Sequence, residues 1–274
     1  MSTPASCLLL LFAIESGHAA TAGNEAVSAP PPVRAAPPAA VASSPTEVLG
    51  RIDALHRRRD DPGALAEEKK LVTESLARAP GDFEVLWRAA RFYFWMSDDP
   101  GAANEQRSQI GKTGWDLAER AIVANPAQAA GYYWAAVTMG NFALGLGVVK
   151  ALTMGMEDKF KARLMRAEQL APEYQFGGVD VAWGRFYEKL PWPKRDRKKA
   201  EFHLRRALTR ASGVNLRARV YLADTLAHDG RGAEGKKLLE EVAGAAVGRY
   251  DAPEERRAKA LGAGLMPALL KMMN

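Results

Sequence analysis

The segment GYYWAAVTMGNFALGLGVVKALTMGM, residues 131–156, is apolar and rich in glycine. It begins with three aromatic residues, and from Phe142 to Met156 its only charged side chain is Lys150. The sequence on both sides of it has the mixed polar and apolar pattern of helical hairpins. A protein gains no free energy by exposing such a segment to water. We therefore expect residues 131–156 to form either the packed middle of the fold or the wall of an apolar cavity.

The composition of the whole chain favours helices. Of its 274 residues, 47% are hydrophobic and 26% are charged, which is ordinary for a globular protein. Ala, Leu, Arg, Glu and Lys are common while β-branched residues are scarce. The formal net charge of +6 permits attraction to nucleic acid or to an anionic membrane but is too small to indicate either as a partner. The single cysteine, Cys7, excludes an internal disulfide framework and a Cys-based zinc site.

The N-terminal residues have the features of a secretory signal. An apolar run covers residues 8–14, and Ala20-Thr21-Ala22 follows as a cleavage pattern, so residues 1–22 are predicted to be a signal peptide. The alternative is a disordered cytosolic tail. Residues 23–45 are rich in Pro and Ala and are predicted to be an extended linker. The folded domain is expected at 46–274, in an exported protein, with Thr46 capping its first helix.

The domain contains a repeated pattern of small and large residues that is typical of tetratricopeptide (TPR) second helices. Small residues let the two helices of a hairpin approach closely, and large ones fill the space between hairpins. Four copies of the pattern occur, at Gly114/Ala118/Ala121, Phe160/Leu164/Ala167, Ala200/Leu204/Ala207 and Gly235/Leu239/Val242. The pattern predicts an all-α, TPR-like superhelix of about five helical hairpins.

The spacing between paired helices is that of an unmodified repeat only in the last copy. In the three earlier copies extra residues lie between the helices, and we expect them to form enlarged turns on one face of the protein. The segment 131–156 belongs to the middle copy. A basic amphipathic helix from Pro253 to Lys271 is predicted to cap the stack.

These features together resemble the TatT family, the T components of tripartite ATP-independent periplasmic (TRAP) transporters. The resemblance rests on Tyr133-Trp134 before Gly140, on the apolar inserted segment, and on the Gly177-Gly178 helix that reaches Tyr187. It implies a periplasmic, membrane-associated protein that associates with an extracytoplasmic solute receptor, forms oligomers, and carries a pore or apolar cavity. The chain lacks the lipobox that would anchor such a protein.

Several side chains are candidates for contacts with a ligand or a partner. A central cavity is predicted to use Tyr133, Trp134, Asn141, Lys150, Trp183, Arg185 and Tyr187. Arg185 would neutralise a ligand carboxylate. Ordinary packing between helices explains the aromatic residues equally well, and a solvated helix face explains the polar ones. Trp192, between two prolines, is a candidate for a contact with a partner protein.

No arrangement of residues in the sequence indicates catalysis, a cofactor or a metal ion. The four histidines are scattered, and none forms a pair with the spacing of metal ligands. The dense basic run from Lys194 to Lys199 lacks aromatic neighbours and is more typical of a solvated loop than of a nucleic-acid site. We therefore expect a non-enzymatic protein with no cofactor.

Two functions remain open at this point. The first is an accessory component of a TRAP-type uptake system, which binds the solute receptor and an apolar small molecule in a central cavity. The second is a TPR scaffold that binds a peptide or protein in its concave groove and has no small-molecule site.

Overall fold

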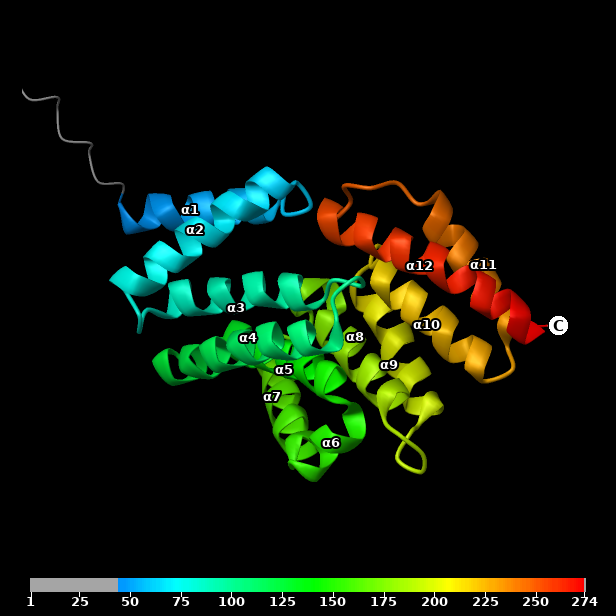
Figure 1. The fold of residues 1–274 in the computed structure, drawn as a ribbon. Helices are drawn as coiled ribbons and strands as arrows, with labels where there is room; N and C mark the ends of the chain where they lie inside the picture. Colours follow the sequence, from blue (N-terminus) through cyan, green and yellow to red (C-terminus); the bar gives the residue numbers. More distant parts are fainter. Residues whose placement is uncertain (1–43, 274) are drawn as a thin grey trace, which may run out of the picture. The chain divides into compact units, whose positions relative to one another are not determined.

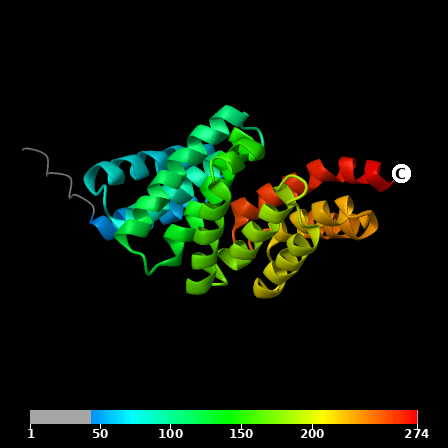
Figure 2. The same ribbon diagram turned by 90° about the horizontal axis from the view of Figure 1, so that it is seen from below.

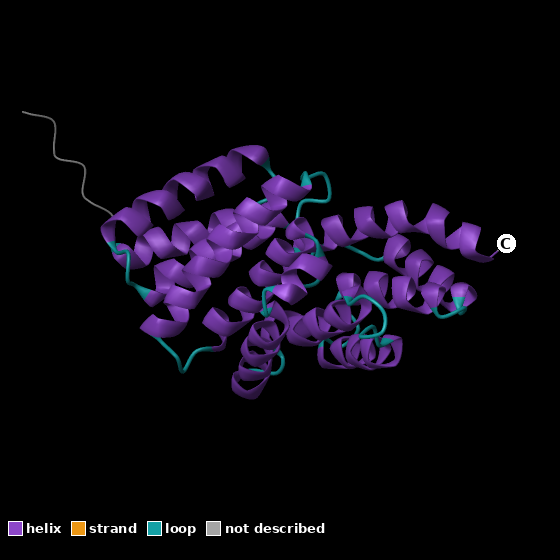
Figure 3. Cartoon of the chain, turned by 60° about the horizontal axis from the view of Figure 1, so that its bottom comes forward, coloured by secondary structure: helices purple, strands orange, loops and turns teal. Residues whose placement is uncertain are grey.

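The computed structural model describes residues 44–273, which form helices joined by short loops and contain no strand (Figure 3). The helices are α1 (Pro45–His56), α2 (Pro62–Arg78), α3 (Phe83–Ser97), α4 (Asn104–Ala124), α5 (Ala129–Leu146), α6 (Val148–Thr153), α7 (Met156–Leu170), α8 (Tyr174–Lys189), α9 (Arg197–Arg210), α10 (Leu216–His228), α11 (Gly232–Gly244) and α12 (Ala252–Met273).

The helices pair into five hairpins followed by a final helix. The pairs are α1–α2, α3–α4, α5–α7, α8–α9 and α10–α11, and the short α6 lies inside the third pair. Helix α12 packs against both α10 and α11. Figures 1 and 2 show the hairpins following one another in chain order, from blue to red. The prediction of an all-α, TPR-like superhelix is confirmed.

The buried positions follow the repeat pattern read from the sequence. All twelve residues of the second-helix pattern are buried: Gly114, Ala118, Ala121, Phe160, Leu164, Ala167, Ala200, Leu204, Ala207, Gly235, Leu239 and Val242. The leucines at the centre of the α7 and α9 copies, Leu164 and Leu204, are both 0% exposed. The pattern therefore predicted which face of each second helix packs against its neighbours.

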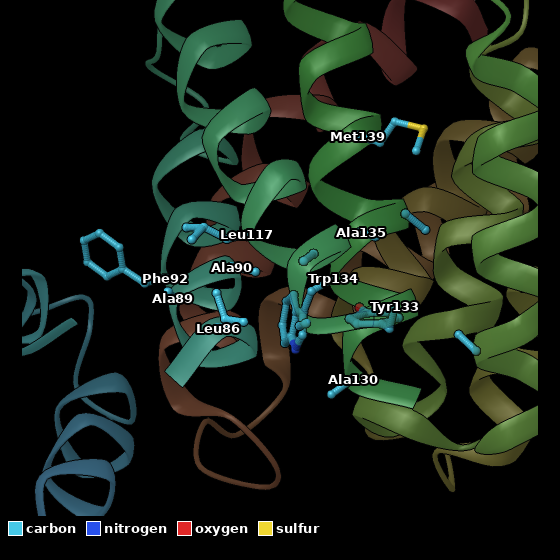
Figure 4. Packing of buried hydrophobic residues seen from close by; sticks show 14 of the residues in the cluster. Leu86, Ala89, Ala90, Phe92, Leu117, Ala130, Tyr133, Trp134, Ala135 and Met139 are labelled. Atoms are coloured by element: carbon cyan, nitrogen blue, oxygen red, sulfur yellow. The ribbon is translucent and has the colours of Figure 1, made fainter. Parts of the chain in front are cut away.

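The main core lies between the first three hairpins and α8. Figure 4 shows Leu86, Ala90 and Trp134 within it, while Phe92 points to the opposite side, toward the blue helices of the first hairpin. Phe92 is 2% exposed, so α3 is buried on two sides. No helix within residues 44–273 is both long and apolar enough to cross a membrane.

The part of the apolar segment that forms α5 is packed in the middle of the fold, whereas Val149 and Met154 near α6 are exposed. Ten residues of α5 are buried, and a Cβ atom at Gly145 would lie 2.6 Å from the Ser108 backbone nitrogen of α4. Helix α5 ends at Gly147, whose φ of +93° suits glycine. Gly145 thus provides a packing contact, and Gly147 provides the turn into α6.

The enlarged turns were predicted only in part. In the first modified copy the extra residues lie mainly in α4, a helix of 21 residues, and in the loop 98–103 before it. In the second they form α6, and in the third they form the loop 190–196. Helix α12 begins one residue before the predicted Pro253 and continues two residues beyond Lys271.

The first helix begins earlier than expected. Ser44, not Thr46, is its N-cap, since the Ser44 hydroxyl accepts from the Glu47 N–H while the Glu47 carboxylate accepts from the Ser44 N–H. Pro45 occupies the first turn, where its missing N–H costs nothing. The predicted signal peptide 1–22 and the linker residues up to 43 lie outside the described residues.

Candidate functional site

The larger of two adjoining cavities, which we call the groove cavity, has a volume of about 540 Å³. Its lining comes from the first helix of each hairpin or its N-cap, from the turn between α1 and α2, and from residues 248–254. The second helices α2, α4, α7, α9 and α11 contribute no lining residue among those described. The lining contains seven aromatic side chains: Trp87, Phe94, Trp95, Tyr133, Trp134, Phe176 and Tyr250.

The groove cavity is closed at one side by contacts between the two ends of the domain. The guanidinium of Arg59, in the turn after α1, donates two hydrogen bonds to the Asp251 carboxylate, at 2.9 and 2.8 Å. Arg256 and Asp60 form a second ion pair between the same segments. Figure 1 shows the start of α12 beside the turn between α1 and α2. The helical array thereby closes on itself around the groove cavity.

Two buried side chains fix the start of α12 and the loop before it. Glu255 is 0% exposed, and its carboxylate accepts hydrogen bonds from the backbone N–H groups of residues 248–250. The guanidinium groups of Arg59 and Arg257 both lie against the ring of Trp95 of α3, and the Trp95 carbonyl accepts from Arg257 at 2.9 Å. The loop before α12 is therefore held to α12, and α12 is held to α3.

Most charges of the groove cavity are paired. Asp53 accepts from Arg91 at 2.7 Å, and Arg217 donates to Asp98 at 2.7 Å as well as to Glu254. Burial would raise the pKa of Asp53, but hydrogen bonds from Arg88 and Arg91 hold that pKa below its usual value. These pairs keep the arginines oriented along the groove wall.

His56 and Glu68 form a buried pair, with 2.8 Å between Nδ1 and Oε1. Burial and the nearby arginines lower the pKa of His56 well below its usual value, while burial raises the pKa of Glu68 to about 7. His56 is therefore uncharged near neutral pH and contributes no positive charge to the groove cavity.

Three polar atoms in the wall of the groove cavity are buried without a hydrogen-bond partner among the described residues. They are Nε of Arg59, Nε of Arg91 and the hydroxyl of Tyr250. Each can donate a hydrogen bond. A buried donor that lacks an acceptor costs about 1–3 kcal/mol, so an acceptor bound in the groove cavity would recover free energy.

A strained turn forms another part of the same wall. Gln175, Phe176 and Gly177 have φ values of 55°, 54° and 76°, so two residues other than glycine adopt the left-handed conformation. That conformation costs a non-glycine residue about 1–2 kcal/mol. The Asn215 amide donates to the Phe176 carbonyl at 2.9 Å, and the ring of Phe176 packs on Tyr250 at 5.1 Å. The turn presents a half-exposed phenylalanine to the groove cavity.

The second cavity, which we call the apolar cavity, has a volume of about 240 Å³. Its walls come mainly from the segment 131–156 together with α7 and α8, and include Val137, Gly140, Leu144, Leu152, Met156, Phe160 and Phe186. Polar groups at its edges include Arg107, whose Nε is buried without a hydrogen-bond partner among the described residues. The volume and the lining suit a small apolar molecule.

The two cavities share one wall. Five residues line both cavities: Phe94, Tyr133, Gly178, Val181 and Arg217. A Cβ atom at Gly178 would lie 2.7 Å from the Tyr133 hydroxyl, so the glycine leaves the space that this ring needs. Burial raises the pKa of Tyr133, and the hydroxyl stays protonated.

The structure brings four of the seven cavity candidates to a cavity wall. Tyr133, Asn141 and Arg185 line the apolar cavity, and Trp134 lines the groove cavity with Tyr133. Asn141 donates to Ser97 at 2.9 Å, and Arg185 already pairs with Asp224 at 3.1 Å. Because Asp224 balances its charge, Arg185 is not a free cation for a ligand carboxylate.

The other three cavity candidates lie elsewhere. Lys150 is exposed on α6 and lines neither cavity. Trp183 and Tyr187 stack on one another and on His203 of α9, with ring centroids 5.7–5.9 Å apart. Trp183 also donates to Glu168 of α7 at 3.1 Å. Both rings therefore serve the packing of α8 against its neighbours.

Trp192 is 87% exposed in the loop after α8. The basic run that follows it is partly engaged within the chain. Lys194 pairs with Glu157 of α7, Arg195 donates to the Leu190 carbonyl at 3.0 Å, and Asp196 caps α9. Residues 44–273 hold no cluster of three or more His, Cys, Asp or Glu side chains that could bind a metal ion.

Sequence reasoning missed most of the groove cavity. Trp95, Phe176, Tyr250 and the pair Arg59–Asp251 were not candidates, although they form its walls and its closure. The repeat register could have indicated the first-helix residues, since these line the concave side of a TPR array. No local signal indicates Asp251, which is 192 positions from its partner.

Comparisons with known proteins support the TPR-like fold and contradict the resemblance to the TatT family. The crystal structure of TTC0263, a thermophilic TPR protein from Thermus thermophilus, is similar to this chain with a TM-score of 0.57 and 19% identity, over 81% of this chain and 98% of that one. No curated protein matches. The family model that matches is that of regulator of microtubule dynamics protein 1-3, over residues 48–177, just under half of the chain.

The resemblance to the TatT family is therefore wrong. The residues that suggested it, Tyr133-Trp134, Gly140 and Gly177, lie within the stretch that matches the other family model. The physical reason is that TPR-like hairpins of different families use the same alternation of small and large residues. The pattern predicts helix packing and does not distinguish one family of such hairpins from another.

Proposed function

We propose that this chain is a non-catalytic scaffold that binds a segment of a partner protein in the groove cavity. The proposal rests on which parts of the fold line the groove cavity. Every described lining residue belongs to the first helix of a hairpin or its N-cap, to the turn after α1, or to residues 248–254, which we call the closing segment. TPR-like folds are protein-interaction scaffolds whose concave face binds the partner.

The chemistry of the groove cavity indicates what such a segment would contain. Seven aromatic rings favour apolar side chains, and aromatic and arginine residues are the commonest sources of binding energy at interfaces. The unpartnered donors on Arg59, Arg91 and Tyr250 favour a segment that places carbonyl or carboxylate oxygens against them. The expected ligand is an extended or helical peptide with apolar and acidic residues.

The test is selection of peptides from a phage-displayed random library against the full chain. Selected peptides are then synthesised with a fluorophore, and their Kd is measured by fluorescence anisotropy. We expect Phe176→Ala to weaken binding about tenfold or more, because this ring faces the groove cavity. Phe202→Ala is the matched control, since Phe202 is 58% exposed on α9 and lines neither cavity.

Two results would overturn the proposal. One is the absence of any enriched peptide. The other is binding of the selected peptides to the Phe176→Ala variant with the Kd of the parent chain.

A second candidate function is the binding of a small apolar molecule, and the one observation that favours it is the apolar cavity. N-phenyl-1-naphthylamine, whose fluorescence rises in apolar surroundings, is a suitable probe. We expect Val137→Phe, which fills the apolar cavity, to remove the signal, and Val123→Phe, at an exposed position of α4, to keep it. Equal signals from the two variants would exclude the apolar cavity as the binding site.

A further inference from the structure

Three large apolar side chains are exposed at one end of the domain. Val149 and Met154 on or next to α6 are 65% and 52% exposed, and Trp192 in the loop after α8 is 87% exposed. Trp192 lies between Pro191 and Pro193, which restrict the backbone around it. In the described part of the chain, each of these three side chains presents at least half of its surface to solvent.

The surrounding residues are strongly basic. Residues 148–161 and 190–199, which we call the basic tip, contain eight Lys or Arg and three Asp or Glu. Their net charge of +5 accounts for nearly all of the +6 of the whole chain. Lys150, Lys159 and Lys198 are exposed and belong to no ion pair among residues 44–273. The excess positive charge of the protein is thus concentrated at this end.

The two segments of the basic tip lie side by side. The ion pair between Lys194 and Glu157 joins the loop after α8 to the first turn of α7. Figure 1 shows α6 and the loop between α8 and α9 at the same end of the domain. The apolar cavity extends to the basic tip, because it is lined by Leu152 and Met156 from one segment and by Leu190 from the other.

We propose that the basic tip docks on the surface of an anionic lipid bilayer. Lysine and arginine side chains near an anionic membrane surface each strengthen binding, and a tryptophan next to them inserts its ring at the level of the headgroups. Val149, Met154 and Trp192 line neither cavity, whereas an anchor for a protein partner commonly lies in a pocket. Charge and exposure together favour a lipid surface over an acidic protein.

This proposal is independent of peptide binding in the groove cavity, since no residue of the basic tip lines that cavity. The test is co-sedimentation of the full chain with vesicles of phosphatidylcholine alone and of phosphatidylcholine with phosphatidylglycerol. We expect binding to the anionic vesicles that weakens as the salt concentration rises.

Variants of the basic tip identify the docking surface. Each lysine near an anionic surface strengthens binding by a factor of about five. The double variant Lys150→Glu/Lys198→Glu should therefore lower the partition coefficient between anionic vesicles and water by about 25-fold or more. Trp192→Ala should lower it about tenfold. The matched controls are Lys237→Glu on α11 and Val123→Ser, an 84% exposed valine at the far end of the α4–α5 pair, and both should bind as the parent does.

A local probe separates the basic tip from residues 1–43. In the Cys7→Ser/Thr153→Cys variant, an environment-sensitive dye attached at the exposed position 153 should shift its emission to the blue when anionic vesicles are added. The proposal is overturned if the dye shows no shift, or if the variants of the basic tip sediment with anionic vesicles as strongly as the parent chain. Far-UV circular dichroism of each variant verifies that the helices remain folded.

Discussion

The close approach of α4 and α5 makes a specific prediction about Gly145. Substitution of a helical glycine by alanine normally stabilises a helix by about 0.8–1 kcal/mol. At Gly145, however, the new methyl group would lie 2.6 Å from the Ser108 nitrogen and would also meet the Asn104 carbonyl oxygen. Both are backbone atoms of α4, so neither can rotate away.

Relief of this overlap requires the two helices to separate, and overpacking of this kind costs about 1–3 kcal/mol. Because backbone atoms must shift, we expect a cost in the upper half of that range. After subtraction of the helix-propensity gain, Gly145→Ala should lower the free energy of unfolding by about 1–2 kcal/mol.

Gly264 of α12 is the matched control. It is exposed inside a helix, and a Cβ atom there would meet nothing within 4 Å. Gly264→Ala should therefore raise the free energy of unfolding by about 0.5–1 kcal/mol. Urea unfolding followed by circular dichroism measures both variants. Equal or greater stability of Gly145→Ala relative to Gly264→Ala would refute the close packing of α4 on α5.

Three further predictions concern charged groups. Asp180→Asn should lower the free energy of unfolding by about 2–3 kcal/mol in urea titrations, because Arg206 and Arg210 lose a fully buried carboxylate partner. Burial alone would raise the pKa of Asp180, but hydrogen bonds from histidine and arginine hold that pKa below its usual value of 3.8. The stability that Asp180 contributes is therefore present above pH 3.8 and is lost as the pH falls through the lower pKa of the folded state. In thermal melts, the difference in stability between parent and variant should shrink at acid pH. Asp251→Asn keeps an N-cap for α12 but leaves the buried guanidinium of Arg59 without its carboxylate, and hydrogen exchange of residues 245–251 should become faster.

The sequence predicted the helix pairing because helix packing is a local, periodic property. The positions of Ala200, Leu204 and Ala207 repeat at helical spacing, and their burial follows directly from that spacing. The segment 131–156 was likewise expected in the middle of the fold or at an apolar cavity. Its α5 part is buried and lines the apolar cavity, while Val149 and Met154 near α6 are exposed.

The candidate site was less predictable because it depends on contacts between distant residues. The pair Arg59–Asp251 closes the groove cavity, yet neither residue stands out in its own segment. The role of Phe176 depends on left-handed backbone angles that a Tyr-Gln-Phe-Gly sequence does not indicate. Trp183 and Tyr187 belong to helix packing because α9 places His203 against them, which their own sequence cannot specify.

Hydrogen–deuterium exchange of the full chain with and without a peptide selected from the random library tests the central claim most directly. We expect the peptide to slow exchange in α1, α3, α5, α8, α10 and residues 245–251, which surround the groove cavity, and to leave the second helices α2, α4, α7, α9 and α11 unchanged. Slower exchange confined to those second helices would contradict peptide binding in the groove cavity.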